Sequence, residues 1–542
     1  MNTFATSTEI YPILFFLWFL SALADYLHFT YLWQLKEYRF DRFKDYLQSE
    51  KGKEFSRSYR IFIRPLVLLF VYTFAGDTLS IQLFALILGI TDLGYNIYSY
   101  KKSFIKRPTF TPKAIIIIGI SLLIELLCSI VFYPVKLMLL FFVSRYFVHA
   151  TLVQLLQLPT YIIKQIYIFL ATKKMKSFSH IITIGITGSY GKSSVKEFTS
   201  HILGTRYRVI KTPRNINTEI GVAKFILQHD FSNYDVFVCE MGAYKIGEIQ
   251  KICRMVRPTI GVLTAINEQH LSLFGSIKKT QQAKYELLRA IPETGLVITN
   301  AENSYCTEFL SELACKQQVL FSADDDQQDV VDILITNIDS GLQGNTFDIL
   351  HKTQGKQHVI TPVIGAHHAY NITAAFLVAE FLSIPLATSI ERAKTLPTQS
   401  HGSINIYQYG KATIIDDSYN ANPRGFVSAL EIMGKFSSEK KRIVITRGML
   451  ELGEESEEIH ERLGGEIAFV ADELIVISRD PYESLKKGVG KKYHTSVQLK
   501  TDPRDLFLYV TAQKEEEVII LLENRIPSNI VCELSAYKPQ RE

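Results

Sequence analysis

The sequence has few cysteines and none in close pairs. Only 6 of its 542 residues are cysteine, and no two of them form a CxxC pair. This scarcity excludes a disulfide framework and argues against a zinc ribbon, so we expect a reducing compartment. The first residues also lack a short basic region followed by a small-residue cleavage site, so we expect no cleavable signal peptide.

An excess of charge of one sign is missing as well. The formal net charge is +5, and the chain has no arginine-rich arm and no repeat that combines basic and aromatic residues. Nucleic acid is therefore not an expected partner. A disordered chain is excluded because 47% of the residues are hydrophobic and 21% are charged.

Hydrophobic residues are concentrated in the first third of the chain. Five apolar runs cover residues 10–33, 61–75, 81–97, 114–132 and 135–156. A membrane-spanning helix needs about 20 such residues. The pattern predicts a helical transmembrane region over residues 1–175 with about five spans, and the alternative is a buried all-helical domain.

Basic residues predict the orientation of these spans. They cluster in residues 36–60, 101–113 and 173–176, and basic loops favour the cytoplasmic side. We therefore expect a multi-pass protein of the inner membrane, with its N-terminus outside, its later domains in the cytoplasm and residues 159–172 on the lipid surface. Asp25 and Glu125 are expected near water at helix ends, the alternative being a functional pair inside the membrane.

A phosphate-binding loop opens the rest of the chain. A strand-like run over 180–186 leads into a glycine loop, and a helix-like stretch over 195–203 follows. In this context backbone N–H groups at the helix start point toward phosphate oxygens. A lysine supplies positive charge, and a serine hydroxyl can bind Mg²⁺. The loop residues are Thr187, Gly188, Ser189, Tyr190, Gly191, Lys192, Ser193 and Ser194.

The loop is a variant, TGSxGK[ST], and resembles that of the Mur ligase family of ATP-dependent, amide-forming enzymes. Further segments between about 180 and 535 resemble family motifs in the family's order. These segments contain Asn215 and Asn217, Glu240-Met-Gly, Asn267 to His270, Ala283-Lys284, Asn300, Gly365-Ala-His367 with Asn371, Asp416-Asp417-Ser-Tyr-Asn420-Ala-Asn422-Pro, and Met449-Leu-Glu-Leu-Gly453.

The resemblance implies a multi-domain α/β protein. A central ATP-binding domain with a phosphate loop would cover residues 176–400, and a Rossmann-like C-terminal domain would cover 401–542. Strand-like segments at 442–446 and 473–478 alternate with helical stretches, which independently predicts a small α/β domain there. In the family the nucleotide lies between these two domains.

The resemblance also implies the chemistry. ATP would convert a substrate carboxylate into an acyl phosphate, and an amine would then attack it to give an amide, ADP and phosphate. The catalytic residues would be Lys192, His270 and Lys284. Mg²⁺ would bind Ser193 and Glu240, and a second metal ion would bind His270 and a carbamylated Lys284.

Taken without the family, these residues have simpler interpretations. By spacing alone, Lys284 is more readily a solvated lysine, Glu240 is as readily an ordinary carboxylate at a strand end, and His270 is more often structural. The remaining implied contacts are polar side chains near the nucleotide, which are Asn300, Asn371, Asp416 and Asp417. Four asparagines are expected to contact the substrate or to shape a tight loop: Asn215, Asn217, Asn420 and Asn422.

Four departures from the family pattern concern the substrates. The apolar first third stands in place of a UDP-binding domain, and Ser403 stands in place of an arginine. Arg447-Gly448 replaces Gly-Asp before Met449, and a late Lys-Gly-Ser-Arg segment reads Glu523-Asn524-Arg525. The last two lie in the domain that usually receives the amine, so the amine need not be D-alanyl-D-alanine.

The expected function is a membrane-embedded ligase of cell-wall synthesis. It would add D-alanyl-D-alanine, or another amino acid or dipeptide, to a UDP-linked or lipid-linked peptidoglycan precursor. A poly-γ-glutamate-synthase-type ligase is an alternative of the same fold. An ATP-binding membrane scaffold without ligase activity is an alternative of another class.

Overall fold

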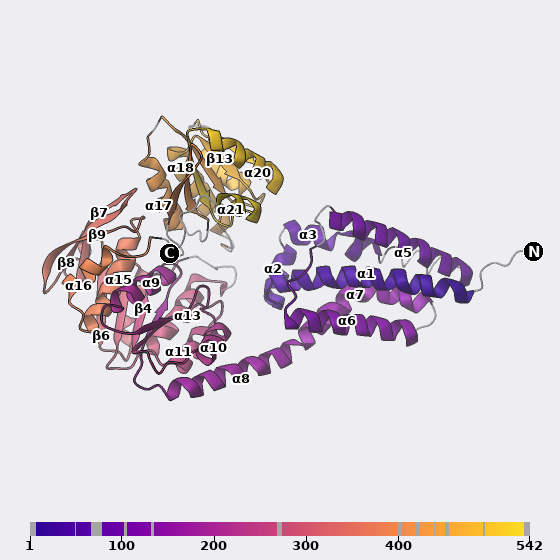
Figure 1. The fold of residues 1–542 in the computed structure, drawn as a ribbon, viewed down its shortest axis with the longest axis horizontal. Coiled ribbons are helices and arrows are strands. Elements are labelled where there is room, and N and C mark those ends of the chain that lie inside the picture. Colours follow the sequence, from indigo (N-terminus) through magenta and orange to yellow (C-terminus); the bar gives the residue numbers. More distant parts are fainter. Residues whose placement is uncertain are drawn as a thin grey trace, which may run out of the picture. The chain divides into compact units, whose positions relative to one another are not determined.

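The computed structural model describes the chain except for residues 1–6, 49, 65, 67–77, 102–105, 132–134, 268–273, 399–403, 419–422, 438, 450–451, 453–454, 491–493 and 536–542. The chain divides into two compact units, Met1–Lys164 and Gln165–Glu542, which Figure 1 draws as ribbons. Helix α8 (Gln157–Lys176) connects them.

The first unit is helical. Its long helices are α1 (Ser7–Leu35), α5 (Thr78–Lys101), α6 (Pro112–Val131) and α7 (Val135–Leu155), and its short ones are α2 (Phe40–Gln48), α3 (Glu50–Ser56) and the π-helical turn η1 (Tyr59–Ile63). Helix α1 packs against α5, α6 and α7. An aromatic core holds one end together, where the rings of Trp33 and Phe43 stack with centroids 4.2 Å apart.

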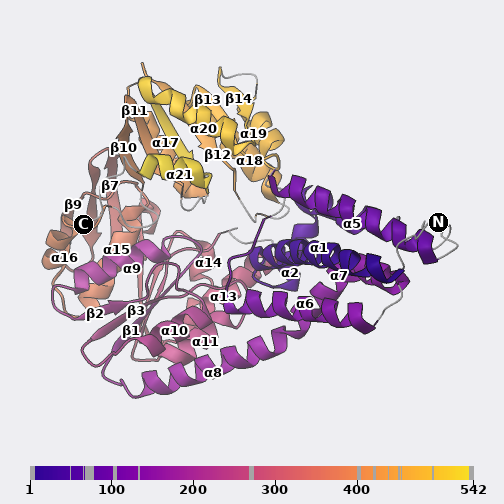
Figure 2. The ribbon, with the colours of Figure 1, turned by 45° about the vertical axis from the view of Figure 1, so that its right-hand side comes forward.

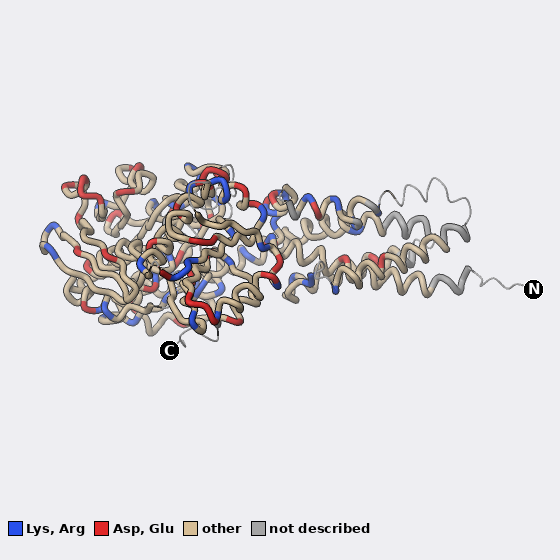
Figure 3. The backbone as a smooth tube through the Cα atoms, turned by 90° about the horizontal axis from the view of Figure 1, so that it is seen from above, with Lys and Arg blue, Asp and Glu red and all other residues tan. Residues whose placement is uncertain are grey.

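Charged side chains are paired inside this helical unit. Arg64 donates a hydrogen bond of 2.6 Å to Asp25, and Arg145 donates one of 2.9 Å to Glu125. All four side chains are almost fully buried. Figure 3 marks the acidic and basic residues of these helices. The expectation that Asp25 and Glu125 lie near water at helix ends is wrong.

The prediction of a five-span inner-membrane protein is also wrong. Within the described residues, one helical stretch, Pro12–Leu35, is long and apolar enough to span a membrane, and half of its most apolar window is buried inside the unit. The sequence misleads because apolar runs with isolated charges fit two structures. Here Asp92 and Arg145 interrupt the runs and pair with other helices. The predicted run 61–75 lies largely outside the described residues. The expected contact of residues 159–172 with lipid depended on the predicted spans and is no longer supported.

The second unit contains two sheets. The larger has the strand order β2-β3-β1-β4-β5-β6-β7-β8-β9, and Figure 2 shows it from another side. Its parallel strands are β1 (Ile182–Thr187), β2 (Val209–Lys211), β3 (Val236–Glu240), β4 (Ile260–Leu263), β5 (Leu296–Asn300) and β6 (Gln317–Ser322). Strand β7 (Ile333–Gly341) extends the parallel set, and β8 (Gly344–His351) and β9 (Gly355–Thr361) add antiparallel pairs.

Helices cover both faces of the larger sheet. Helices α9 (Lys192–Leu203), α15 (His368–Phe381) and α16 (Leu386–Ala393) share one hydrophobic core with the strands. Helices α10 (Glu219–Gln228), α11 (Glu248–Val256) and α13 (Ile277–Arg289) share the core on the other face. Strands buried on both faces read as continuous apolar runs, and this explains the run before the phosphate loop.

The smaller sheet has the order β10-β11-β15-β12-β13-β14. Its strands are β10 (Asn405–Tyr409), β11 (Ala412–Asp417), β12 (Lys441–Thr446), β13 (Glu473–Val476), β14 (Ser496–Leu499) and β15 (Val518–Glu523). Helices α17 (Pro423–Gly434), α18 (Ser456–Val470) and α19 (Tyr482–Val489) pack on one face. Helices α20 (Pro503–Ala512) and α21 (Ser528–Ser535) pack on the other.

The predicted α/β character of both parts after residue 180 is confirmed. All strand pairs of the smaller sheet are parallel except β10–β11. The carboxyl ends of β11, β15, β12 and β13 therefore meet at one edge, where ligands bind in open α/β sheets. The domain boundaries at residues 175 and 400 stay predictions.

Candidate functional site

The phosphate loop lies between the end of β1 and the start of α9. Gly188 and Gly191 have φ angles of +147° and +80°, in a region that side chains other than glycine rarely enter. A Cβ atom on Gly191 would lie 2.6 Å from Asn371 Oδ1. The loop is held from outside as well, since the Ser189 N–H donates a hydrogen bond of 2.7 Å to the Ala265 carbonyl. The predicted strand, glycine loop and helix are all present.

The ammonium group of Lys192 lies against the loop itself. It donates hydrogen bonds to the carbonyls of Gly188, at 2.7 Å, and Ser189, at 3.0 Å. Burial lowers the pKa of Lys192, while the charge of Glu240 acts in the opposite direction. The loop and the first turn of α9 thus combine a lysine with the N-terminal end of a helix, which favours an anion.

Glu240 ends β3, the strand next to β1, and its carboxylate accepts three hydrogen bonds. The donors are Ser193 Oγ and Asn217 Nδ2, both at 3.0 Å, and Lys196 Nζ at 3.1 Å. Burial acts to raise the pKa of Glu240, but Lys196 and Lys192 hold it below its usual value. Two hard oxygen donors, a carboxylate and a hydroxyl, therefore stand side by side. Mg²⁺ prefers such ligands.

Lys196 is a site residue that the sequence analysis missed. Its side chain is 1% exposed and ion-paired with Glu240. It lies three residues after Ser193 on α9, so both side chains lie on one face of the helix. That spacing was the available signal.

Lys284 is buried on α13, so the interpretation as a solvated lysine is wrong. It is 3% exposed. Burial, and next the charge of Lys192, lower the pKa of Lys284 well below its usual value, whereas Glu248 and Glu286 act in the opposite direction. Burial therefore favours the uncharged form of this amine more than in a solvated lysine.

Three predicted residues cannot be placed. His270 belongs to 268–273, and Asn420 and Asn422 belong to 419–422, all outside the described residues. In the part of the chain that is described, no three His, Cys, Asp or Glu side chains come close enough together to hold a metal ion. Ser193 and Glu240 are the pair of predicted metal ligands that the structure brings together.

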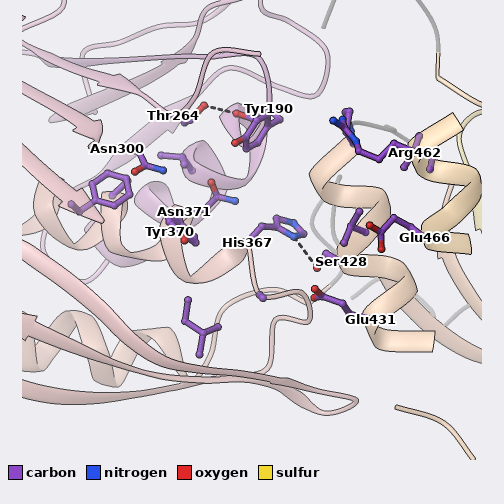
Figure 4. A pocket seen from close by; sticks show the side chains of 18 residues that line it. Tyr190, Thr264, Asn300, His367, Tyr370, Asn371, Ser428, Glu431, Arg462 and Glu466 are labelled. Atoms are coloured by element: carbon purple, nitrogen blue, oxygen red, sulfur yellow. Dashed lines mark hydrogen bonds between the residues drawn. The ribbon is translucent and has the colours of Figure 1, made fainter. Parts of the chain in front are cut away.

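A cavity of about 450 Å³ lies beside the phosphate loop. Figure 4 shows Asn300, Asn371 and Tyr190 on one wall, and Arg462 and Glu466 of α18 on the other. His367 Nδ1 and Ser428 Oγ are 3.3 Å apart across it. Both predicted nucleotide asparagines therefore line a cavity between the parts that carry the two sheets.

The other asparagines and aspartates lie differently. Asn217 contacts Glu240, and Asn215 has a φ angle of +59°, as in a turn. Asp417 is opposite Glu523 in the β11–β15 register. Burial raises the pKa of both carboxyl groups. Asp416 accepts a hydrogen bond from Ser418 N at 3.1 Å. Neither aspartate lines the cavity.

Two family models match the chain: the Mur ligase middle domain over residues 186–379, and the model described as "Mur ligase, glutamate ligase domain" over 404–523. Among curated proteins, the UDP-N-acetylmuramoyl-tripeptide--D-alanyl-D-alanine ligase of Buchnera aphidicola is 29% identical over 353 residues, which are 63% of this chain and 75% of that protein. The enzyme of the same name from Escherichia coli is 29% identical over 342 residues, 62% of this chain and 73% of that protein.

Solved structures show the same fold. MurF from Acinetobacter baumannii gives a TM-score of 0.60 at 23% identity, over 69% of this chain and 80% of that one. The MurF ligase from Thermotoga maritima, solved in complex with ADP, gives 0.59 at 24% identity, over 69% of this chain and 84% of that one.

Proposed function

Since the chain belongs to the Mur ligase family, we propose that it is an ATP-dependent ligase that adds D-alanyl-D-alanine, or an amine similar to it, to a peptidoglycan precursor. The observation that carries this proposal is the joint placement of Lys192, Ser193 and Glu240 at one glycine loop beside the cavity. Membrane embedding is not part of it.

The loop and α9 would bind the phosphates of ATP. Asn300 and Asn371 line the cavity, where their amides can hydrogen-bond the base and sugar. Lys192 and the N–H groups of the loop would stabilise the charge that develops as the γ-phosphoryl group is transferred. Ser193 and Glu240 would hold Mg²⁺, which when bound neutralises charge on the phosphates.

The proposed reaction has two steps. A carboxylate oxygen of the precursor attacks the γ-phosphorus, and the bond to ADP breaks. The amine nitrogen then attacks the carbonyl carbon, phosphate leaves with the bonding electrons, and the nitrogen loses a proton. The protein accelerates such a reaction largely by holding the reactants in a fixed geometry, because its own side chains take little part in the covalent chemistry.

Lys284 would act as a carbamate in this site. A neutral amine can attack CO₂, forming an N–C bond and losing a proton, and the product is an anion with two oxygens. Burial and the lowered pKa of Lys284 support this modification. His270 would act beside it, and a ribose contact from Asp416 or Asp417 stays a prediction.

The test is ADP release by the purified chain. We expect release to require both the UDP-linked tripeptide precursor and D-alanyl-D-alanine. Lys192→Ala should lower it by about 10³-fold or more. The control is Lys394→Ala, an exposed lysine paired with Glu391. An ADP release that no amine stimulates would contradict the proposal.

The amine panel should include glutamate. The family model that matches residues 404–523 is described as a glutamate ligase domain. In addition, Arg447-Gly448 departs from the family pattern. Stimulation by glutamate without a response to the dipeptide would favour the poly-γ-glutamate-synthase-type alternative. If neither Lys192→Ala nor Lys284→Ala impaired the function in cells, the result would favour the alternative of an ATP-binding scaffold without ligase activity.

A further inference from the structure

The Glu240 carboxylate is already occupied by donors of the protein. Its Oε1 atom accepts the hydrogen bond from Asn217, and its Oε2 atom accepts those from Ser193 and Lys196. An ionised carboxylate has about four lone-pair positions for such contacts. At least three of them are used, and one of the three donors is a cation.

Lys196 and Glu240 are held in place together. Their side chains are 1% and 3% exposed, and the ammonium nitrogen lies 3.1 Å from the carboxylate oxygen. The Glu240 N–H donates a hydrogen bond of 3.1 Å to Thr212 Oγ1, which fixes the backbone at the end of β3. Glu197 is farther from Lys196 Nζ, at 3.7 Å, and also pairs with Lys211. Within the described residues, Glu240 is therefore the main partner of this ammonium group.

Positive charge acts on this carboxylate from two lysines. In the part of the chain that the structure describes, Lys196 and then Lys192 are the charged groups that contribute most to lowering the pKa of Glu240. A divalent cation that binds Glu240 comes within a few ångströms of these ammonium groups, and like charges repel each other strongly where little water screens them. The phosphates of a nucleotide carry negative charge that offsets this repulsion.

We propose that Lys196 is a positioning residue that holds the Glu240 carboxylate while no divalent cation is bound, and that its charge makes the cation bind tightly only together with nucleotide phosphates. This inference rests on the proposed function, which makes Glu240 a ligand of Mg²⁺. A purely structural counter-ion would stabilise the fold without affecting metal binding. Lys196 instead competes with the metal ion for one carboxylate, so removing its charge should strengthen metal binding.

Titration with Mn²⁺ alone, followed by the electron paramagnetic resonance signal of the free ion, tests this competition. We expect Lys196→Met to bind Mn²⁺ about tenfold or more tightly than the wild type without nucleotide, because one like charge is removed. Lys196→Arg keeps the charge and should match the wild type. With ADP present the difference should become smaller, because the phosphates supply negative charge. A pH of about 8 is suitable, since a carboxyl group with an ordinary pKa of about 4.3 is then ionised.

Thermal unfolding gives a second readout, because an ion that binds the folded state raises its thermal midpoint. Mn²⁺ should therefore raise the midpoint of Lys196→Met more than that of the wild type. The double variant Lys196→Met with Glu240→Gln should lose this gain, since the carboxylate is gone. Lys196→Gln keeps a donor without a charge and guards against a failure of Lys196→Met to fold. Lys394→Met, at an exposed lysine paired with Glu391, is the matched control.

Equal or weaker Mn²⁺ binding by both uncharged variants would overturn the inference, and so would a gain that persists after Glu240→Gln. Neither readout needs turnover, so the inference and the proposed function can fail separately. If the wild type ligates normally while the uncharged variants bind Mn²⁺ no better, the role of Lys196 is wrong and the proposed function stands. If these variants bind Mn²⁺ more tightly while the wild type releases no ADP, the role of Lys196 stands and the proposed function is wrong.

Discussion

Ser193 donates a hydrogen bond of 3.0 Å to Glu240 and thereby connects the first turn of α9 with the end of β3. The two residues are 47 positions apart in the sequence. They meet because β1 and β3 are parallel neighbours whose carboxyl ends reach the same edge. A hydroxyl and a carboxylate therefore lie side by side at one phosphate loop, where we propose that they bind Mg²⁺, and several consequences of this proposal can be measured.

Removing the carboxylate should separate metal binding from nucleotide binding. For Glu240→Gln we expect the affinity for ADP in the presence of Mg²⁺ to fall about tenfold or more, while the affinity without Mg²⁺ changes little, because hard cations require anionic oxygen ligands. Fluorescence titration with a labelled ADP checks this. Glu391→Gln, at an exposed glutamate of α16, is the control. An equal loss under both conditions would argue that Glu240 is structural.

Lys196 should matter for stability as well as for the site. Its ammonium and the Glu240 carboxylate are both almost fully buried, 3.1 Å apart. Removing one partner of a buried pair leaves an uncompensated charge and typically costs about 3–5 kcal/mol. We expect Lys196→Met to lower the free energy of unfolding in urea by about 3 kcal/mol. The double variant Lys196→Met with Glu240→Gln should recover part of it, and simple additivity of the two losses would contradict this pairing.

The shape of the phosphate loop depends on Gly191. Alanine there would combine a φ angle of +80° with a Cβ atom 2.6 Å from Asn371 Oδ1. We expect Gly191→Ala to weaken ADP binding about tenfold or more, because the loop must move to relieve the contact. Gly434→Ala is the matched control, since a Cβ there would be 4.0 Å from its nearest neighbour, Val470 Cγ1. Unchanged ADP binding in Gly191→Ala would show that the loop tolerates the change.

Most of the site that was predicted for the second unit can be recognised from short sequence patterns. The loop around Lys192 and the carboxylate Glu240 each follow a buried apolar strand, and that arrangement can be read from a short window. The contact from Lys196 to Glu240 joins residues 44 positions apart, so only the helical spacing from Ser193 hinted at it. The burial of Lys284 could not be read locally either, because it depends on how α13 packs against the sheet.

The first unit shows the limit of such patterns. An apolar run with one embedded charge fits a membrane span or a helix whose charge pairs inside a bundle. The deciding contacts join distant residues, as from Arg145 to Asp25 across 120 positions. Neither hydrophobicity nor the distribution of basic residues reports those pairings.

The buried acid pair of the smaller sheet should make stability depend on pH. Burial raises the pKa of Asp417 and Glu523 above the unfolded value of about 4. The folded state then keeps a proton that the unfolded state releases, so this contribution is fully present below about pH 4 and is lost as pH rises toward the raised folded pKa. We expect Glu523→Gln to flatten the fall in unfolding free energy above pH 4, measured by urea titration at several pH values. Glu516→Gln, at an exposed site, should leave the slope unchanged, and an identical slope in Glu523→Gln would contradict the raised pKa of this buried pair.

Asp25 should be the most sensitive acidic position of the helical unit. Its carboxylate lies 2.6 Å from Arg64, 2.9 Å from Arg60 and 3.3 Å from Arg145, and it has no exposed surface. Asp25→Asn would leave three buried guanidiniums facing two remaining carboxylates, Asp92 and Glu125. We expect a loss of about 3 kcal/mol or more in unfolding free energy, seen as a lower thermal midpoint of the full chain. Asp41→Asn is the control, because Asp41 pairs with Arg39 while 44% exposed, and such surface pairs contribute about 1 kcal/mol at most. Similar midpoints for the two variants would mean that the buried charges are not what holds α1 against its neighbours.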